Sequence, residues 1–211
     1  MSTKPMGKLY TICEWIMKLS FINLLWIMSI ICGLILFGFI PGTVAMFTVV
    51  RKWFMKETNV PIWGTFWSTY KSELVKSNCF GLILIAAGAM IYADYYFILN
   101  LTGIIRIVAT SILLIITGLY AIILLFFFPV YVHYNLNFLS YFKYSFFIGI
   151  INIRISILIL LGLVVDIFLL LYIPGLIPFF AGSSVACIIM SSCIFIFSRM
   201  QTQRADKIIT E

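Results

Sequence analysis

Charge is scarce in this chain of 211 residues: Asp, Glu, Lys and Arg make up 10% of it, whereas hydrophobic residues make up 64%. The only histidine, His133, has no neighbouring residues with which to build a metal site. The five cysteines form no CxxC pair, and most lie in or beside apolar stretches, where cysteine behaves as a small hydrophobe. No glycine-rich phosphate loop of the GxxxxGKS or GxxxxGKT type occurs. The sequence therefore predicts no metal site and no cofactor.

Long apolar stretches take the place of charge. Most are as long as the roughly 20 residues with which a helix crosses the hydrocarbon core of a bilayer. Because lipid offers the backbone no hydrogen bonds, and because continuous runs do not suit the alternating strands of a barrel, they predict helices. The expected fold class is all-α, a polytopic transmembrane helical bundle in a single membrane domain over residues 1–211. The stretches are residues 21–40, 79–99, 104–132, 155–173 and 176–197.

Basic and neutral segments alternate between these stretches. Lysine or arginine occurs in residues 51–76, in residues 133–154 and in the C-terminal tail, whereas residues 100–105 and residues 172–177 carry none. The positive-inside rule then places the basic segments on the cytoplasmic side of the membrane. Lipid is thus the expected surrounding, and the net charge of +7 needs no nucleic-acid partner, since no basic face or recognition motif accompanies it.

The N-terminal apolar stretch leaves two topologies open. Lysines before residue 19 favour a cytoplasmic N-terminus, which requires an even number of crossings before Arg51. Residues 19–50 are long for one helix and short for two, and a hairpin turning near Gly33 or at Pro41-Gly42 would fit. We therefore expect six membrane helices with both termini in the cytoplasm. Five helices, with the N-terminus outside, is the alternative.

Two segments between the spans predict interfacial helices on the cytoplasmic side. In residues 58–78 the aromatic residues recur at helical spacing, with Asn59 as a cap and Pro61 in the first turn. Residues 134–147 form a second candidate. Such helices can dock a partner protein, or they can simply anchor the chain to lipid. The candidate docking loop comprises Arg51, Lys52, Trp53, Trp63, Trp67, Tyr70 and Lys71.

A weak internal repeat relates residues 66–103 to residues 138–175 at an offset of 72. It aligns Asp94 with Asp166 and Gly103 with Gly175. Each copy would comprise an interfacial helix, a span with an acid near its outer end, and an outer turn. Chance matching in a biased composition is the alternative.

Charged residues within the spans form the candidate polar cluster. Asp94, Arg106 and Asp166 lie in or at the start of apolar stretches, where a charge is costly unless it is paired or wetted. An antiparallel hairpin would bring Arg106 close to Asp94, so we predict an ion pair between them, with Asp166 near it or near water. The cluster would line a cavity for a substrate or proton, or it would only fix the helix register. The small residues of Gly182-Ser183-Ser184 indicate close helix packing rather than a catalytic serine.

A known family shares a series of motifs with this chain. They are Asn23-Leu24-Leu25-Trp26, Gly33-Leu34, Phe37-Gly38-x-x-Pro41-Gly42-Thr43-x-Ala45-Met46-Phe47, Val50-Arg51-Lys52-Trp53, Phe66-Trp67-x-x-Tyr70-Lys71 and Asn78-x-x-Gly81. The chain resembles the YesL-type bacterial membrane proteins over nearly its full length. That resemblance implies a companion of carbohydrate uptake systems, ABC permeases and polysaccharide-utilisation genes. It supplies no catalytic residues.

Three functional hypotheses follow. The first is a non-enzymatic accessory or permease-like membrane protein of carbohydrate uptake, which pairs with an ABC permease, its ATPase or a sensor kinase through residues 51–76. The second is a transporter of small solutes that uses Asp94 and Asp166. The third is a membrane enzyme acting on lipid-linked substrates, which would need a nucleophile–base or metal set that the sequence does not show.

Overall fold

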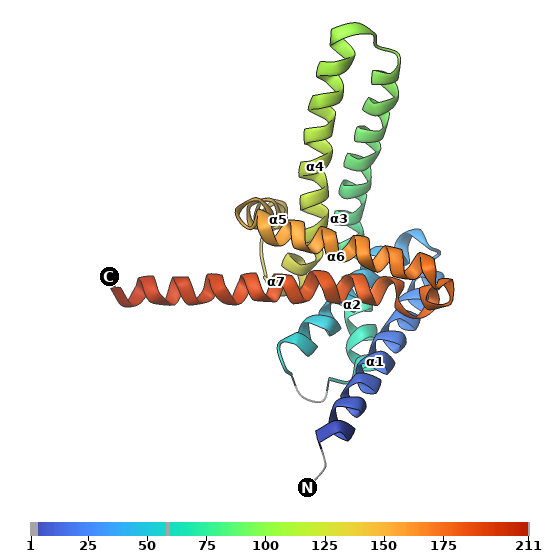
Figure 1. Ribbon diagram of the computed structural model, residues 1–211, viewed down its shortest axis with the longest axis vertical. Coiled ribbons are helices and arrows are strands. Elements are labelled where there is room, and N and C mark those ends of the chain that lie inside the picture. The colour runs from blue at the N-terminus through green and yellow to red at the C-terminus, as the bar shows by residue number, and fades with distance from the viewer. Residues whose placement is uncertain (1–3, 58–59, 211) are drawn as a thin grey trace.

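The computed structural model of the protein describes residues 4–57 and 60–210, with side chains over residues 9–57 and 60–200. This part of the chain is helical and contains no strand, which confirms the all-α fold class. Five helical segments are long and apolar enough to cross a membrane, so the chain is a multi-pass membrane protein. The elements (Figure 1) are α1 (Lys4–Cys32), α2 (Leu36–Phe54), α3 (Ile62–Leu99), α4 (Gly103–His133), α5 (Phe138–Ile151), α6 (Ile153–Tyr172), the 3₁₀ turn η1 (Pro174–Leu176) and α7 (Ile177–Thr210).

The N-terminal stretch folds as a hairpin that turns at Gly33, the first of the two expected sites. Leu34 and Ile35 occupy the left-handed region with φ of 51° and 68°, an unusual conformation for a β-branched residue such as Ile35. The backbone N–H groups of Gly33, Leu34 and Ile35 all donate to carbonyl groups of the preceding turn. Leu34 is 81% exposed and Ile35 67% exposed. An apolar, internally hydrogen-bonded turn of this kind is suited to the hydrocarbon.

Helix α2 is the centre of the fold and packs against α1, α3, α4 and α7. Pro41 lies inside α2 and has no N–H to donate to the carbonyl group of Phe37, four residues earlier. The side-chain amide of Asn78 on α3 donates to that carbonyl oxygen instead, at 3.0 Å. The proline in α2 and the asparagine in α3 therefore complement each other across the helix interface, which matters where no water can replace the lost bond. Pro41-Gly42, the alternative turn site, forms no turn.

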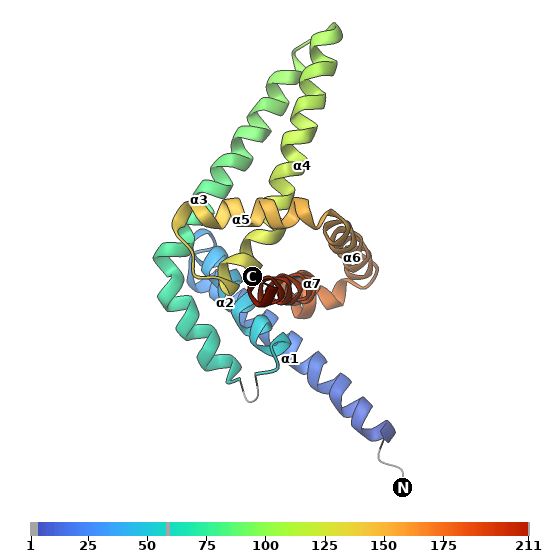
Figure 2. The same ribbon diagram turned by 90° about the vertical axis from the view of Figure 1, so that its left-hand side faces the viewer.

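Helix α3 corrects one expectation. Residues 58–78 do not form a separate interfacial helix, because Ile62–Leu99 is one helix of 38 residues. Asn78, at the expected boundary, donates to the carbonyl oxygen of Leu74 within α3 rather than ending or starting a helix. Figure 2 shows that α3 changes direction midway. At about 57 Å along its path, α3 exceeds the hydrocarbon core of about 30 Å. Pro61 directly precedes α3, and Asn59 lies outside the described residues.

Helix α5 is a separate short helix, as expected for the second interfacial segment, although it spans Phe138–Ile151 rather than residues 134–147. Its buried residues include Tyr141, Ser145 and Ile148, which face α4 and the core. The two segments of the candidate repeat differ at this point. Residues 66–99 lie in one helix, whereas residues 138–172 are interrupted at Asn152.

The hairpins are arranged crosswise. Figure 1 shows the α3–α4 hairpin upright, with α6 and α7 running across its base, and Figure 2 shows α6 and α7 close to end on. Spanning helices rarely tilt by more than about 40° from the bilayer normal, so only one of the two hairpins stands upright in a flat bilayer in this arrangement. The start of α1, the end of α2 and the start of α3 lie at one end of the molecule, and the α3–α4 turn lies at the other (Figure 1).

Candidate functional site

The charged residues predicted to cluster are dispersed. Asp94 and Arg106 are both exposed near the free end of the α3–α4 hairpin and do not form the predicted ion pair. In the described part of the chain the ion pairs are Glu14–Lys18 and Lys52–Glu57. The hairpin register explains the difference, because Asp94 lines a shallow groove of about 230 Å³ with residues 109–116 of α4, about one turn beyond Arg106.

Asp166 lies elsewhere, between α6 and α7. The Ser184 hydroxyl is 2.9 Å from Oδ2 of Asp166 and 2.7 Å from the carbonyl oxygen of Phe180. An acid therefore does lie beside this serine, although sequence proximity gave no sign of it. His133 stacks on Phe197, with ring centroids 4.4 Å apart, and does not complete a serine–histidine pair there. The contact between Asp166 and Ser184 connects α6 to α7. The groove lined by Asp94 does not include Asp166.

The candidate docking loop has a buried half and an exposed half. Phe66 is fully buried, and the Tyr70 hydroxyl donates to the carbonyl oxygen of Ser29 on α1 at 3.2 Å. Trp63 is 54% exposed and Lys71 is exposed, so the two point away from the anchored face of α3. Trp67 lies between them and packs edge-on against Tyr70, with ring centroids 5.3 Å apart.

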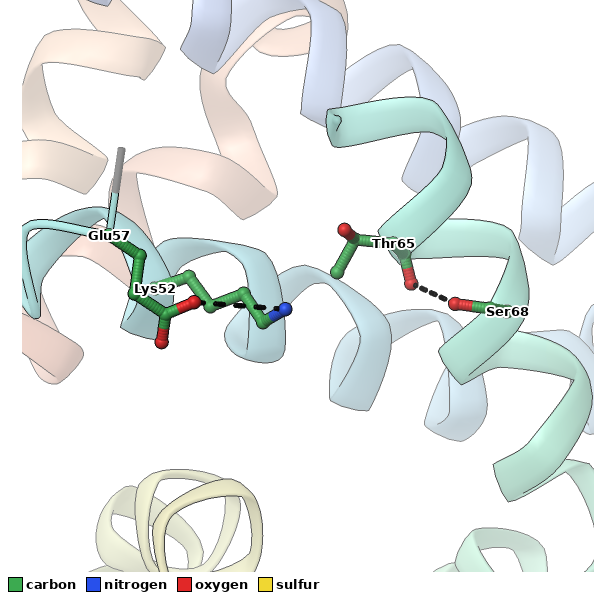
Figure 3. A network of polar contacts seen from close by, with 4 residues as sticks. All are labelled: Lys52, Glu57, Thr65 and Ser68. Carbon is green, nitrogen blue, oxygen red and sulfur yellow. Dashed lines mark hydrogen bonds and ion pairs between the residues drawn. The ribbon is translucent and has the colours of Figure 1, made fainter. Parts of the chain in front are cut away.

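The end of α2 completes this loop. Trp53 packs edge-on against Trp15 of α1, with ring centroids 5.8 Å apart, and Arg51 is half-buried. Figure 3 shows Lys52 and Glu57 facing each other at 3.8 Å, near the first turns of α3, where the Ser68 hydroxyl donates to the carbonyl oxygen of Thr65. The loop residues therefore extend from the end of α2, where Trp53 meets Trp15, to the level of the Gly33 turn, where the Tyr70 hydroxyl meets Ser29. Only part of each helix face is free.

Residues of the motifs shared with the YesL-type proteins connect α1 and α2 to α7. We call the contact of Asn23 and Trp26 with Gly182 and Ser183 the α1–α7 joint. Asn23 is fully buried and makes three hydrogen bonds to α7. Its side-chain amide donates to the carbonyl oxygen of Pro178 at 2.8 Å, and its Oδ1 accepts from the backbone N–H groups of Gly182 and Ser183 at 2.8 and 3.0 Å. A side chain at Gly182 would meet the Trp26 ring at 3.0 Å, so this glycine allows α7 to approach α1 closely. The expectation of close packing at Gly182-Ser183 is confirmed.

An apolar cavity of about 460 Å³ lies beside this joint, between α1, α2, α4, α6 and α7. Its few polar atoms are already paired, because the Trp26 indole N–H donates to the Thr43 hydroxyl, which donates to the carbonyl oxygen of Phe39. Phe47 and Phe128 stack at its wall with ring centroids 5.6 Å apart. Such a cavity suits hydrocarbon rather than a hydroxylated ligand.

Sequence reasoning missed one polar cluster, at the junction of α3, α4 and α5. The Tyr131 hydroxyl donates to the carboxylate of Glu73. The Lys76 ammonium lies 5.5 Å from the Tyr131 ring centroid and 5.9 Å from that of Tyr141. Glu73 and Lys76 lie one helical turn apart on the helix expected over residues 58–78, so their spacing already placed them on one face of that helix. Within the described residues no three His, Cys, Asp or Glu side chains lie close enough to hold a metal ion.

Comparison with known proteins gives related chains without assigned functions. A family profile described as "Protein of unknown function, DUF624" matches residues 19–95. Three proteins of Bacillus subtilis (strain 168) are similar. "Uncharacterized protein YteU" is 35% identical over 181 residues, which cover 86% of this chain and 81% of the relative. "Uncharacterized protein YesV" is 34% identical over 203 residues, 96% of this chain and 98% of the relative. "Uncharacterized protein YesL" is 31% identical over 195 residues, 92% and 91% of the two chains. No solved structure matches the chain.

Proposed function

The chain belongs to the DUF624 family, as the YesL-type resemblance implied, and from that premise we propose that it is a non-enzymatic accessory subunit of a carbohydrate uptake system. It would dock a permease, its ATPase or a sensor kinase through the exposed half of the loop from Arg51 to Lys71. The link to carbohydrate rests on what the YesL-type resemblance implies. The docking role rests on the structure of the loop.

The apolar lining of the cavity beside the α1–α7 joint supports an accessory role over a sugar-conducting one. A sugar buries many hydroxyl groups, each of which needs a hydrogen-bond partner in the protein. The cavity of about 460 Å³ offers Trp26 and Thr43, whose polar groups already bond to each other or to the backbone. Asp94 lines a groove between α3 and α4, whereas Asp166 bonds to Ser184 between α6 and α7, and this separation favours the accessory role over transport through the two acids.

The observation that carries the proposal is the outward position of Trp63 and Lys71 on a firmly anchored helix. Tyr70 and Phe66 hold this part of α3 against α1 and α2, while the indole of Trp63 remains 54% exposed. Exposed tryptophan on a rigid support is typical of residues that dominate binding between proteins. Lipid anchoring by the same aromatic residues is the competing explanation.

Site-specific photocrosslinking in native membranes tests the proposal. A photoreactive residue replaces Trp63 or Lys71, and the matched control replaces Ile104, which is 76% exposed at the opposite end of the molecule. We expect adducts with a permease, an ATPase or a sensor kinase from the two loop positions only. Adducts with lipid alone, or the same protein adducts from Ile104, would contradict the docking role.

Uptake by cells adds a functional readout. The double variant Trp63→Ala/Lys71→Ala should reduce carbohydrate uptake as far as deletion of the gene does, while its amount in the membrane stays unchanged. The matched control is Tyr92→Ala/Arg106→Ala, which removes an exposed aromatic residue and an exposed cation at the other end. Uptake that is normal in the loop variant, or equally reduced in the control, would count against the proposal.

A further inference from the structure

A second cavity, of about 620 Å³, lies between α5 and the C-terminal part of α7. Lys143, Tyr144 and Asn152 line it from α5 and its C-terminal cap, and Arg199 lines it from α7. Two cations from two different helices therefore face one cavity. No carboxylate is among the residues that line it.

The cations of this cavity lack acidic partners in the described part of the chain. The described carboxylates are engaged or distant: Glu14 and Glu57 form ion pairs with lysines, and Glu73 and Asp166 accept from hydroxyl groups. Lys143 and Arg199 are exposed and form no ion pair among the described residues. Two cations that face one cavity with no carboxylate of the described residues beside them attract an anion, and both arginine and lysine bind phosphate groups.

The rest of the cavity wall is apolar. Ile148 and Ile196 are buried at 2% and 1% exposure, while Phe147 and Ile151 remain 56% and 73% exposed. A free phosphate ion would leave this wall bare. A molecule with an anionic head and a hydrocarbon chain would satisfy the cations and cover the apolar wall at once.

We propose that the α5–α7 cavity binds an anionic phospholipid, with Lys143 and Arg199 holding its phosphate and the apolar wall receiving the start of an acyl chain. Tyr144 suits this level of the membrane, because tyrosine prefers the headgroup region. Basic pockets between membrane helices are a known way to bind lipid headgroups. The site is separate from the docking loop and does not depend on the accessory role.

Binding is measured with the full-length protein in micelles of a neutral maltoside, with a fluorescent phosphatidylglycerol as the probe. Phosphatidylcholine with the same chains, glycerol phosphate and inorganic phosphate serve as competitors. Each cation beside an anionic lipid adds to the free energy of binding. Removing two of them in Lys143→Gln/Arg199→Gln should therefore weaken binding of the probe about 30-fold. The charge-matched control Lys56→Gln/Arg106→Gln should bind within about threefold of the wild type, since these exposed residues lie outside the cavity.

The competitors separate the sources of the phosphate. We expect phosphatidylcholine to compete poorly, and glycerol phosphate and inorganic phosphate not to compete at millimolar concentration. Displacement of the probe by inorganic phosphate would assign the site to a free anion and overturn the proposal that it binds a lipid. Unchanged binding in Lys143→Gln/Arg199→Gln, or equal loss in the control, would overturn the site. The charge-preserving variant Lys143→Arg/Arg199→Lys should restore binding and guards against a folding defect.

Discussion

Replacing Asn23 by leucine should destabilise the protein by about 2 kcal/mol. The leucine side chain has a similar volume but removes three hydrogen bonds between α1 and α7, of 2.8, 2.8 and 3.0 Å. Hydrogen bonds between membrane helices contribute about 0.6 kcal/mol each on average, with a maximum near 1.7 kcal/mol, so three give about 2 kcal/mol or more. Gly182 lies four residues after Pro178, so its N–H can donate to that carbonyl group once the amide is gone. We therefore take the sum of three average bonds, about 2 kcal/mol, rather than the sum of three maximal ones.

The measurement is the unfolding free energy in mixed micelles of a maltoside and dodecyl sulfate, followed by tryptophan fluorescence. The control is Asn100→Leu, because the Asn100 side chain makes only a local bond of 3.2 Å to the carbonyl oxygen of Tyr96. We expect the control to cost less than about 0.5 kcal/mol. If Asn23→Leu unfolds within about 0.5 kcal/mol of the wild type, or if both variants cost the same, the α1–α7 joint does not have the role described here.

Three further predictions test the packing and the polar residues. Asn78→Leu should lower the free energy of unfolding by about 1 kcal/mol. Adding Pro41→Ala should recover most of this loss, because alanine restores an N–H donor for the carbonyl oxygen of Phe37. Additive losses in a double-mutant cycle would refute the pairing. Gly38→Ala should lower the free energy of unfolding by about 1–3 kcal/mol, because its Cβ would lie 2.2 Å from the Ser29 carbonyl oxygen. The control Gly118→Ala, whose Cβ would have no neighbour within 4 Å, should be neutral or slightly stabilising. Equal melting temperatures of the two variants would contradict this packing. Asp94→Asn and Asp166→Asn should leave carbohydrate uptake by whole cells unchanged, and a folded variant without uptake would favour the transporter hypothesis instead.

The helices themselves were largely readable from the sequence. The apolar stretch 104–132 corresponds to helix α4 (Gly103–His133), and the stretch 155–173 corresponds to helix α6 (Ile153–Tyr172). In lipid, long apolar runs satisfy their backbone hydrogen bonds by forming helices. The turn near Gly33 was one of two expected sites. Helix α3 was divided wrongly, since a change from amphipathic to fully apolar sequence at Asn78 indicates a change of environment and does not by itself end a helix.

The contacts at the candidate site were not readable in the same way. The ion pair between Asp94 and Arg106 failed because the hairpin register depends on how the turn at residues 100–102 rotates α4, which the sequence does not specify. Asn23, a polar residue in an apolar stretch, carried a signal that a partner must exist. Its partners, Pro178 and Gly182, lie on α7 more than 150 positions later, and only the fold identifies them.

Residue labelling from the two sides of the membrane tests the central claim, that the basic and aromatic docking loop faces the cytoplasm where a partner can dock. Lys71→Cys lies in the third turn of α3, and Thr102→Cys lies in the turn that follows the other end of α3. In a background whose five native cysteines are replaced by alanine, a membrane-impermeant maleimide should reach Lys71→Cys only in inside-out vesicles and Thr102→Cys only in intact cells. Labelling of Lys71→Cys in intact cells would contradict the account.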